Sequence, residues 1–362
     1  MARIFSGIQP SGELHIGNYL GAVRHWVELQ SQHESFICIV DYHAITQPYD
    51  VDALEPQTMA MAIGLLAAGI DPSHSVLFVQ SHVPEHTELN WVFNSVTPVG
   101  HLERMTQYKE KSQRQFKEKP KPPRSSTVAV SANRPLSADR PIETSVPVGL
   151  LNYPVLQAAD VLLYKADLVP VGEDQIQHVE LMREIARKWN ARYSPGFFPE
   201  PDSETGQARR IIGLDGQAKM SKSLGNTVGI LDEPDEIWER IRPAVTDPAR
   251  ITKRDPGTPE KCNVYSLHQY FSPPDTVEEV ATKCRTAGWG CIDCKRVLSD
   301  NIATAFAPMR ERARDLDDHP KRMLDVLADG AAKAQAIATD TMRYVRSHMG
   351  FLPKSRETSV SS

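Results

Sequence analysis

Short apolar runs alternate with segments of helical periodicity along the first half of this 362-residue chain. The runs at residues 35–41 and 75–80 are almost wholly apolar, as buried parallel strands are. Residues 3–5, 167–171 and 210–214 predict further short strands. Strands that alternate with helices in this way predict an α/β fold with a doubly wound parallel sheet. Ligands bind such sheets at the carboxyl ends of the strands.

Strand patterns end near residue 228, and only helical patterns follow. Apolar spacing predicts helices there at residues 237–245, 264–271, 276–286, 295–315 and 321–347. We therefore expect an α/β domain over residues 1–227 and an all-helical domain over residues 228–352, followed by a polar, frayed tail at 353–362. Residues 117–147 interrupt the first domain with six prolines and five serines, which predicts a loosely held insertion.

The stretch from residue 5 to residue 21 has the chemistry of a phosphate site. A short strand leads into glycines and a proline, and a helix is predicted to begin near Gly17. Small residues let a ligand approach the backbone, while free N–H groups and the helix dipole attract negative charge. His15 and Asn18 add neutral donors. An ordinary tight turn is the alternative, because strand, glycine and helix often follow one another.

A second polar stretch, residues 219–223, reads Lys-Met-Ser-Lys-Ser and follows the last predicted strand. Two lysines on one loop can stabilise the negative charge that develops on phosphate oxygens in a phosphoryl-transfer transition state. A solvated loop of lysines and serines is the alternative interpretation.

Composition narrows the class of protein further. The net charge is −5, so the charge of the whole chain does not favour nucleic-acid binding, although residues 104–124 hold eight Lys or Arg against two Glu. The sequence has no apolar run of membrane-spanning length and no signal-peptide pattern at its start. We therefore expect a cytoplasmic enzyme with no membrane or DNA partner.

The two polar stretches also carry a family resemblance. Residues 10–18 resemble the first signature of class I aminoacyl-tRNA synthetases, in its His-Ile-Gly-Asn form, and residues 219–223 match the second signature in full. Nearly the whole chain outside the insertion resembles the bacterial tryptophanyl-tRNA synthetases, and the residues that carry this likeness are 5–12, 39–46, 103–112, 153–164 and 169–175.

The resemblance implies a fold and a reaction. The fold would be a Rossmann-like catalytic domain followed by a helical, tRNA anticodon-binding domain. L-Tryptophan would be activated with ATP and Mg²⁺ and transferred to tRNA(Trp) by a homodimeric enzyme. Typical members lack the insertion, where Lys117, Lys119, Lys121 and Arg124 could contact tRNA. A linker without function is the preferred alternative.

The resemblance also implies site residues. The catalytic residues would be His15, Asn18, Lys219 and Lys222. The ATP site would comprise Gln9, Pro10, Ser11, Gly17, Asn18, Gly172, Glu173, Asp174, Ile211, Lys219, Met220, Ser221, Lys222 and Ser223. Lys109 and Lys111 would reach the phosphates or form a solvated helix face.

Asp160 would accept the indole N–H of tryptophan. Its apolar neighbours on both sides predict burial, and a single buried acceptor suits a ligand with a single donor. The remaining tryptophan-binding residues that the resemblance implies are Phe5, His43, Val169, Val171 and Gln175.

Four of the five cysteines lie close together in the sequence: Cys262, Cys284, Cys291 and Cys294. In a reducing cytosol this clustering favours a metal site over disulfides. The spacing is similar to that of tryptophanyl-tRNA synthetases that hold a 4Fe–4S cluster, which the resemblance implies here. Zinc and four uninvolved core cysteines are the alternatives.

Other enzymes share part of this pattern. A tyrosyl-tRNA synthetase has both signatures but usually reads Gly-Gly-Ser-Asp-Gln where this chain reads Val-Gly-Glu-Asp-Gln at residues 171–175. A paralogue that has lost tRNA charging is a second alternative, against which the intact helical domain argues. A nucleotidyltransferase of the same superfamily would lack the second signature and the helical domain.

Overall fold

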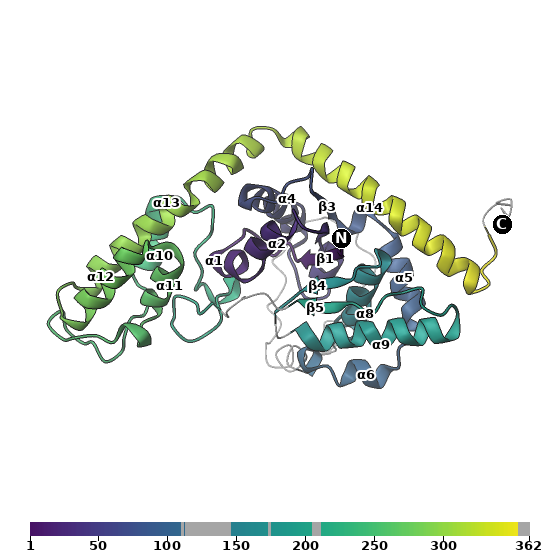
Figure 1. Cartoon of the computed structure of the whole chain (residues 1–362), viewed down its shortest axis with the longest axis horizontal. Coiled ribbons are helices and arrows are strands. Elements are labelled where there is room, and N and C mark those ends of the chain that lie inside the picture. Colours follow the sequence, from purple (N-terminus) through teal and green to yellow (C-terminus); the bar gives the residue numbers. More distant parts are fainter. Residues whose placement is uncertain (110–111, 113–145, 173–174, 205–210, 354–362) are drawn as a thin grey trace, which may run out of the picture.

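The computed structural model describes residues 1–109, 112, 146–172, 175–204 and 211–353 (Figure 1). Nearly all of the predicted insertion and of the predicted tail therefore lies outside the described residues. The sheet has five strands in the order β3-β2-β1-β4-β5, and every neighbouring pair is parallel. The strands are β1 (Arg3–Ile8), β2 (Glu34–Ile39), β3 (Ser75–Val79), β4 (Leu168–Pro170) and β5 (Asp202–Glu204). The predicted parallel α/β fold is confirmed.

The structure departs from the predicted strands at two points. The edge strand β5 was not predicted, because it reads Asp-Ser-Glu and has no apolar run; its first two residues are exposed. The strand predicted at residues 210–214 is not part of the sheet. There, Ile212 pairs with Lys219 in an isolated antiparallel bridge. This segment thus folds back on the second signature instead of joining β5.

The helix after β1 starts at Ile16, one residue before the predicted start. It consists of α1 (Ile16–Asn18), a π-helical turn η1 (Tyr19–Val23) and α2 (Arg24–Leu29). π-Helical turns occur frequently at functional sites. The other helical elements of the first half are α3 (Asp41–Ala44), α4 (Val51–Ala68), η2 (Gln80–His82), α5 (Glu85–Asn94), α6 (Val99–Glu103), α8 (Val148–Leu163) and α9 (Ile176–Arg192).

The second half is helical, as the sequence predicts. Its elements are η4 (Lys222–Leu224), α10 (Pro234–Ile241), η5 (Pro259–Lys261), α11 (Asn263–Phe271), α12 (Pro274–Arg285), α13 (Cys291–Asp317) and α14 (Pro320–His348). In Figure 1, α13 rises from the group of α10, α11 and α12, and α14 descends from its end across the α/β part. Among the described helices, none combines the length and the apolar character needed to cross a bilayer.

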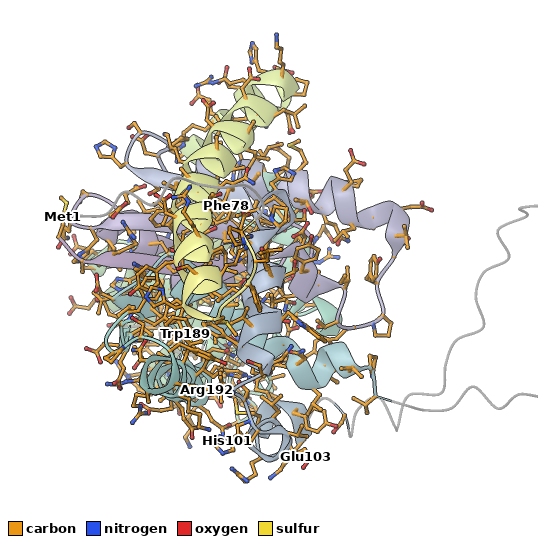
Figure 2. All side chains as sticks on the ribbon, turned by 90° about the vertical axis from the view of Figure 1, so that its right-hand side faces the viewer. Met1, Phe78, His101, Glu103, Trp189 and Arg192 are labelled. Atoms are coloured by element: carbon orange, nitrogen blue, oxygen red, sulfur yellow. The ribbon has the colours of Figure 1, made fainter. Side chains whose placement is uncertain are left out.

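Helix α14 ties the end of the chain to the sheet. It packs against β3 and α5, and Figure 2 shows it in front of the region that holds Phe78. Arg346 of α14 forms an ion pair with Glu88 of α5, and Thr339 donates to Glu85 at 3.1 Å. The alanines on its inner face are buried in the same core as the strands. Residues distant in sequence therefore share one core with the sheet.

Candidate active site

The two signature stretches lie side by side at the carboxyl end of β1. The first turns directly after the strand, where Ser11 N–H donates to the carbonyl of Gln9 at 2.8 Å. The chain that leaves the second stretch then runs along the first. Ile16 N–H donates to the carbonyl of Val228 at 2.9 Å, and Ile230 N–H donates to that of Leu14 at 3.0 Å. Backbone pairing thus joins segments about two hundred residues apart.

Individual side chains of the second signature rest on glycines of the first. Gly12 has φ of +101°, and a Cβ on it would stand 2.8 Å from Lys222 Nζ. The Lys222 ammonium therefore lies over the Gly12 backbone. A Cβ on Gly17 would stand 3.1 Å from Met220 Cβ. The structure thus brings together Lys222, Met220 and Gly17, three of the residues predicted to surround ATP.

The loop of the second signature is held by one buried side chain, Asn226. Its Oδ1 accepts from Ser221 N–H at 2.7 Å, and its Nδ2 donates to Asp215 Oδ2 at 2.8 Å. Met220 N–H donates to the carbonyl of Ile211 at 2.9 Å, which closes a turn that contains Lys219. Sequence reasoning assigned Asn226 no role. Its place three residues after the signature was the available signal.

Lys222 is half-buried, and burial lowers the pKa of its ammonium. Glu13 and Asp232 raise that pKa, whereas Arg240 lowers it. Asp232 itself forms an ion pair with Arg240 at 2.8 Å. The Lys222 ammonium thus has both acidic and basic side chains around it. It lies beside the glycine turn, where it could contact a polyphosphate.

His15 and Asn18 cap the start of α1 reciprocally. Asn18 N–H donates to His15 Nδ1 at 3.3 Å, and His15 N–H donates to Asn18 Oδ1 at 3.4 Å. Burial, then the charges of Lys222 and Lys219, lower the pKa of His15 to about 4. The imidazole is therefore neutral near pH 7. Since Nδ1 accepts a hydrogen bond, Nε2 carries the proton and can donate to an anionic ligand.

A buried polar network surrounds Asp160, which is 1% exposed. Its Oδ1 accepts from Gln80 Nε2 and from His86 Nδ1, both at 2.7 Å, and its Oδ2 accepts from His43 Nε2 at 2.8 Å. His86 Nε2 in turn lies 2.7 Å from the Tyr164 hydroxyl. Burial raises the pKa of Asp160, but the hydrogen bonds from the two histidines outweigh it and hold the pKa at about 2. Asp160 is thus a buried carboxylate.

The predicted burial of Asp160 is confirmed, and the predicted His43 contacts it directly. Phe5 on β1 and Val169 on β4 are buried in the same apolar cluster as the neighbours of Asp160, and Val171 packs against that cluster. Phe5 stacks on Tyr164 with 5.6 Å between ring centroids.

The remaining predicted residues divide into three groups. The carboxyl end of β1 leads into Gln9, Pro10 and Ser11, and that of the adjacent parallel strand β4 leads towards Gly172. All four residues therefore lie on the side of the sheet where these strands end. Gln175 directly precedes α9. Glu173, Asp174, Lys111 and the side chain of Ser223 lie outside the described residues.

Sequence reasoning placed His43 at the site with Asp160 but missed the other side chains of the network. Gln80 falls at the carboxyl end of a predicted strand, where ligands bind, but the sequence does not show its contact with Asp160, and it indicates no role for His86 or Tyr164. A histidine in the first turn of an otherwise amphipathic helix was a weak signal for His86. Only its approach to Asp160, 74 residues later, gives it meaning.

The four clustered cysteines line one small cavity together with Arg250, Trp289 and Val280. Burial raises the pKa of the Cys294 thiol to about 12 and also raises the pKa values of Cys262 and Cys284. In the part of the chain that the structure describes, no set of three or more His, Cys, Asp or Glu side chains is placed to hold a metal ion. Because all four cysteines line the same cavity, the residues that cluster in the sequence are also close together in space.

Comparison with known proteins identifies the family. Residues 1–307 match the model of "tRNA synthetases class I (W and Y)". The chain belongs to this family. It is 50% identical over 356 residues to the tryptophan–tRNA ligase of Deinococcus radiodurans, covering 97% of this chain and 99% of that one. The tryptophan–tRNA ligase of Thermotoga maritima is 42% identical over 354 residues, with the same coverage of both chains.

Solved structures agree with these relatives. The tryptophanyl-tRNA synthetase of Campylobacter jejuni, complexed with ADP and tryptophan, superposes with a TM-score of 0.82 at 34% identity, over 96% of this chain and 100% of that one. A tyrosyl-tRNA synthetase from Archaeoglobus fulgidus has a TM-score of 0.59 at 20% identity, over 86% of this chain and 90% of that one. The tyrosine enzyme therefore shares the fold alone.

Proposed function

We propose that this chain is a tryptophan–tRNA ligase, which activates L-tryptophan with ATP and Mg²⁺ and transfers it to tRNA(Trp). The observation that carries the proposal is the position of the Lys222 ammonium over the Gly12 turn, which joins both signatures of the family at one place. The named relatives support the choice of tryptophan, because they match almost the full length of both chains.

In the first step, the tryptophan carboxylate attacks the α-phosphorus of ATP. A P–O bond forms to the amino acid while the bond to the bridging oxygen breaks, and pyrophosphate leaves with Mg²⁺. Lys219 and Lys222 stabilise the negative charge that grows on the phosphate oxygens. The neutral His15 donates through Nε2, and Asn18 holds its ring by the reciprocal cap. No covalent intermediate with the enzyme is needed, so catalysis rests on positioning and electrostatics.

The same proposal assigns the other site residues. Gln9, Pro10, Ser11, Gly17 and Gly172 line the nucleotide side, joined by Glu173, Asp174, Ile211, Met220, Ser221 and Ser223. On the other side, Asp160 accepts the indole N–H, and the ring lies among Phe5, His43, Val169, Val171 and Gln175. Support comes from the buried, ionised state of Asp160, since a buried acceptor left unpaired penalises a ligand without the matching donor.

In the second step, the terminal ribose of tRNA(Trp) takes the tryptophanyl group at its 2′-hydroxyl, by analogy with class I enzymes. Residues 228–352 would read the anticodon, while α14 within them also covers β3. We also propose that the enzyme is a homodimer in the cytoplasm. This part of the proposal rests on the family resemblance alone. Light scattering on the purified protein measures the oligomeric state, and a monomer would remove the dimer from it.

Pyrophosphate exchange with each of the twenty amino acids tests the function. We expect exchange with tryptophan and no comparable exchange with tyrosine, followed by charging of bulk tRNA with tryptophan. Exchange with tyrosine in place of tryptophan would overturn the proposal. Exchange with tryptophan but no charging of tRNA would instead indicate a paralogue that supplies only the adenylate.

We also propose that Cys262, Cys284, Cys291 and Cys294 hold a 4Fe–4S cluster. Four thiols on one cavity are the donor set that such a cluster uses, with one thiolate on each iron. A single zinc ion bound by the same four thiolates is the alternative. Bound there, the cluster would connect the start of α11 with α12 and α13.

Anaerobic purification and metal analysis test the cluster. We expect a brown protein with about four irons and four acid-labile sulfides per chain. Cys291→Ser should lose iron, whereas Cys38→Ser should keep it, because Cys38 is buried in β2 and does not line the cavity of the other four. A colourless protein with one zinc per chain would replace the cluster by the zinc alternative.

A further inference from the structure

Three fully buried polar side chains contact Asp160 or its partner and have no place in the mechanism so far. Gln80 stands at the end of β3, His86 in the first turn of α5, and Tyr164 directly after α8, and all three are 0% exposed. Buried polar groups are costly unless they are fully hydrogen-bonded. Here Gln80 and His86 bond to Asp160, and Tyr164 bonds to His86, so each of these polar groups has a partner.

The acceptor positions of Asp160 can be counted. A carboxylate offers about four, two on each oxygen. Gln80 and His86 fill both positions on Oδ1, whereas His43 fills one position on Oδ2. Among the described residues, no further donor reaches Asp160, so the position left open is on Oδ2, the oxygen that also accepts from His43. His43 is 5% exposed and the least buried of the three donors.

His86 is itself fixed from behind. Because a carboxylate only accepts, Nδ1 of His86 carries the proton, and Nε2 is left to accept from the Tyr164 hydroxyl. The Tyr164 ring stacks against Phe5 and Phe36, with centroid distances of 5.6 and 4.8 Å. Packing thus holds Tyr164 in place. Tyr164 in turn orients His86, and His86 orients the Asp160 carboxylate, as second-layer hydrogen-bond partners orient ligand-binding groups in other sites.

We propose that His86 is a positioning residue for tryptophan recognition: with Gln80 it occupies Oδ1 of Asp160, so that Oδ2 is the oxygen that receives the indole N–H. This inference rests on the proposed role of Asp160 as the indole acceptor. His86 touches neither substrate, and acts through the orientation of the carboxylate. The neighbouring Tyr164 belongs to the same device.

Two substitutions at one position separate the contacts of His86. In His86→Asn, the amide nitrogen can take the place of Nδ1 and keep the bond to Asp160. In His86→Gln, the amide reaches the place of Nε2 and keeps the bond to Tyr164 but not that to Asp160. The probe is a pair of substrates, tryptophan and 3-benzothienylalanine, in which sulfur replaces the indole N–H. Pyrophosphate exchange gives KM for each.

We expect the wild-type protein to show a KM at least about tenfold higher for the sulfur analogue than for tryptophan, as the loss of one hydrogen bond to a charged group predicts. His86→Gln should reduce this ratio to about threefold or less, because it should raise KM for tryptophan and leave KM for the sulfur analogue unchanged. His86→Asn should restore most of it. KM for ATP should stay within about twofold in both variants, because Asp160 lies on the tryptophan side.

The opposite outcomes are distinguishable. If His86→Gln raises both KM values equally, or if the Asn and Gln variants behave alike, His86 is only structural and the inference fails. Asp160→Asn reports on the underlying assumption: an unchanged ratio there would overturn the indole role of Asp160 itself. Should the histidine variants not fold, Tyr164→Phe keeps the stacked ring and removes the hydroxyl. An unchanged ratio in that variant would equally contradict the inference.

Discussion

Asp160 and Lys222 carry opposite charges in the proposed mechanism, and the fold holds them in different ways. Asp160 is 1% exposed and receives three hydrogen bonds from side chains of three other elements. Lys222 is half-buried in a short turn, and its ammonium lies over the backbone of Gly12. The acceptor is thus embedded in the core, whereas the cation is carried on a loop.

This difference follows from what each charge has to do. A group that selects a ligand must be fixed before the ligand arrives, because a ligand without the matching donor then leaves a buried acceptor position unpaired. A group that accelerates a reaction must interact more strongly with the transition state than with the ground state. We therefore expect changes at Asp160 to appear in KM for tryptophan, and changes at Lys222 to appear in kcat.

Removal of the Lys222 ammonium should have the largest effect. We expect Lys222→Ala to lower kcat of pyrophosphate exchange by about 100-fold or more, with KM for tryptophan within about twofold, because preorganised charges act on the transition state. Lys253→Ala is the matched control, since that lysine side chain is 74% exposed in the helical part. Equal kcat values in the two variants would contradict the role of Lys222 in the transition state.

Neutralisation of Asp160 should come next in size. Asp160→Asn keeps the shape but removes the charge, and should raise KM for tryptophan by about 10- to 100-fold, as a lost hydrogen bond to a buried charge predicts. The matching measurement is KM for ATP, which should stay within about twofold. A variant that loses kcat while both KM values stay constant would contradict the division of roles.

The support beneath Lys222 should have a smaller effect. Gly12→Ala places a Cβ where the Lys222 ammonium lies and strains a backbone with φ of +101°, and should lower kcat about tenfold. Gly196→Ala has a similarly positive φ of +75° in open space and controls for the strain. In the double variant with Lys222→Ala, Gly12→Ala should add almost nothing. Fully additive effects would mean that Gly12 acts by another route.

The pH dependence of stability should change least. The folded pKa of His15 is about 4, against about 6.5 in an unfolded chain. As pH falls from 6.5 to 4, the unfolded state therefore takes up a proton that the folded state does not, and stability decreases through that window. His15→Gln should flatten this decrease in urea unfolding between pH 7 and 5. An unaltered slope would show that His15 titrates normally.

Local patterns predicted much of the fold but left identifiable gaps. Strands β1 to β4 and the helices of the second half follow from runs and periodicities within a few neighbouring residues. The short polar strand β5 does not, because only its place beside β4 makes it a strand. Segment 211–214 was wrongly predicted as a sheet strand because its pattern is apolar, while its partner is its own signature loop.

The candidate site divides in the same manner. The two signatures, the apolar setting of Asp160 and the clustered cysteines can be read from the sequence, because each depends on residues close together in the chain. The hydrogen bonds to Asp160 cannot, because Gln80, His86 and His43 approach it from 74 to 117 residues away. Of these three donors, only His43 was expected at the site, and only through the family resemblance. A histidine in a helix has no visible partner until the fold supplies one.

The sequence by itself determined the class of fold, the family and the residues that carry charge at the site. Only the tertiary structure decided which oxygen of Asp160 remains open to a ligand, that Lys222 lies over Gly12, and that α14 packs on β3. The physical reason is that chain chemistry is local, whereas acceptor saturation, burial and the pKa shifts of His15 and Asp160 depend on groups brought together by folding.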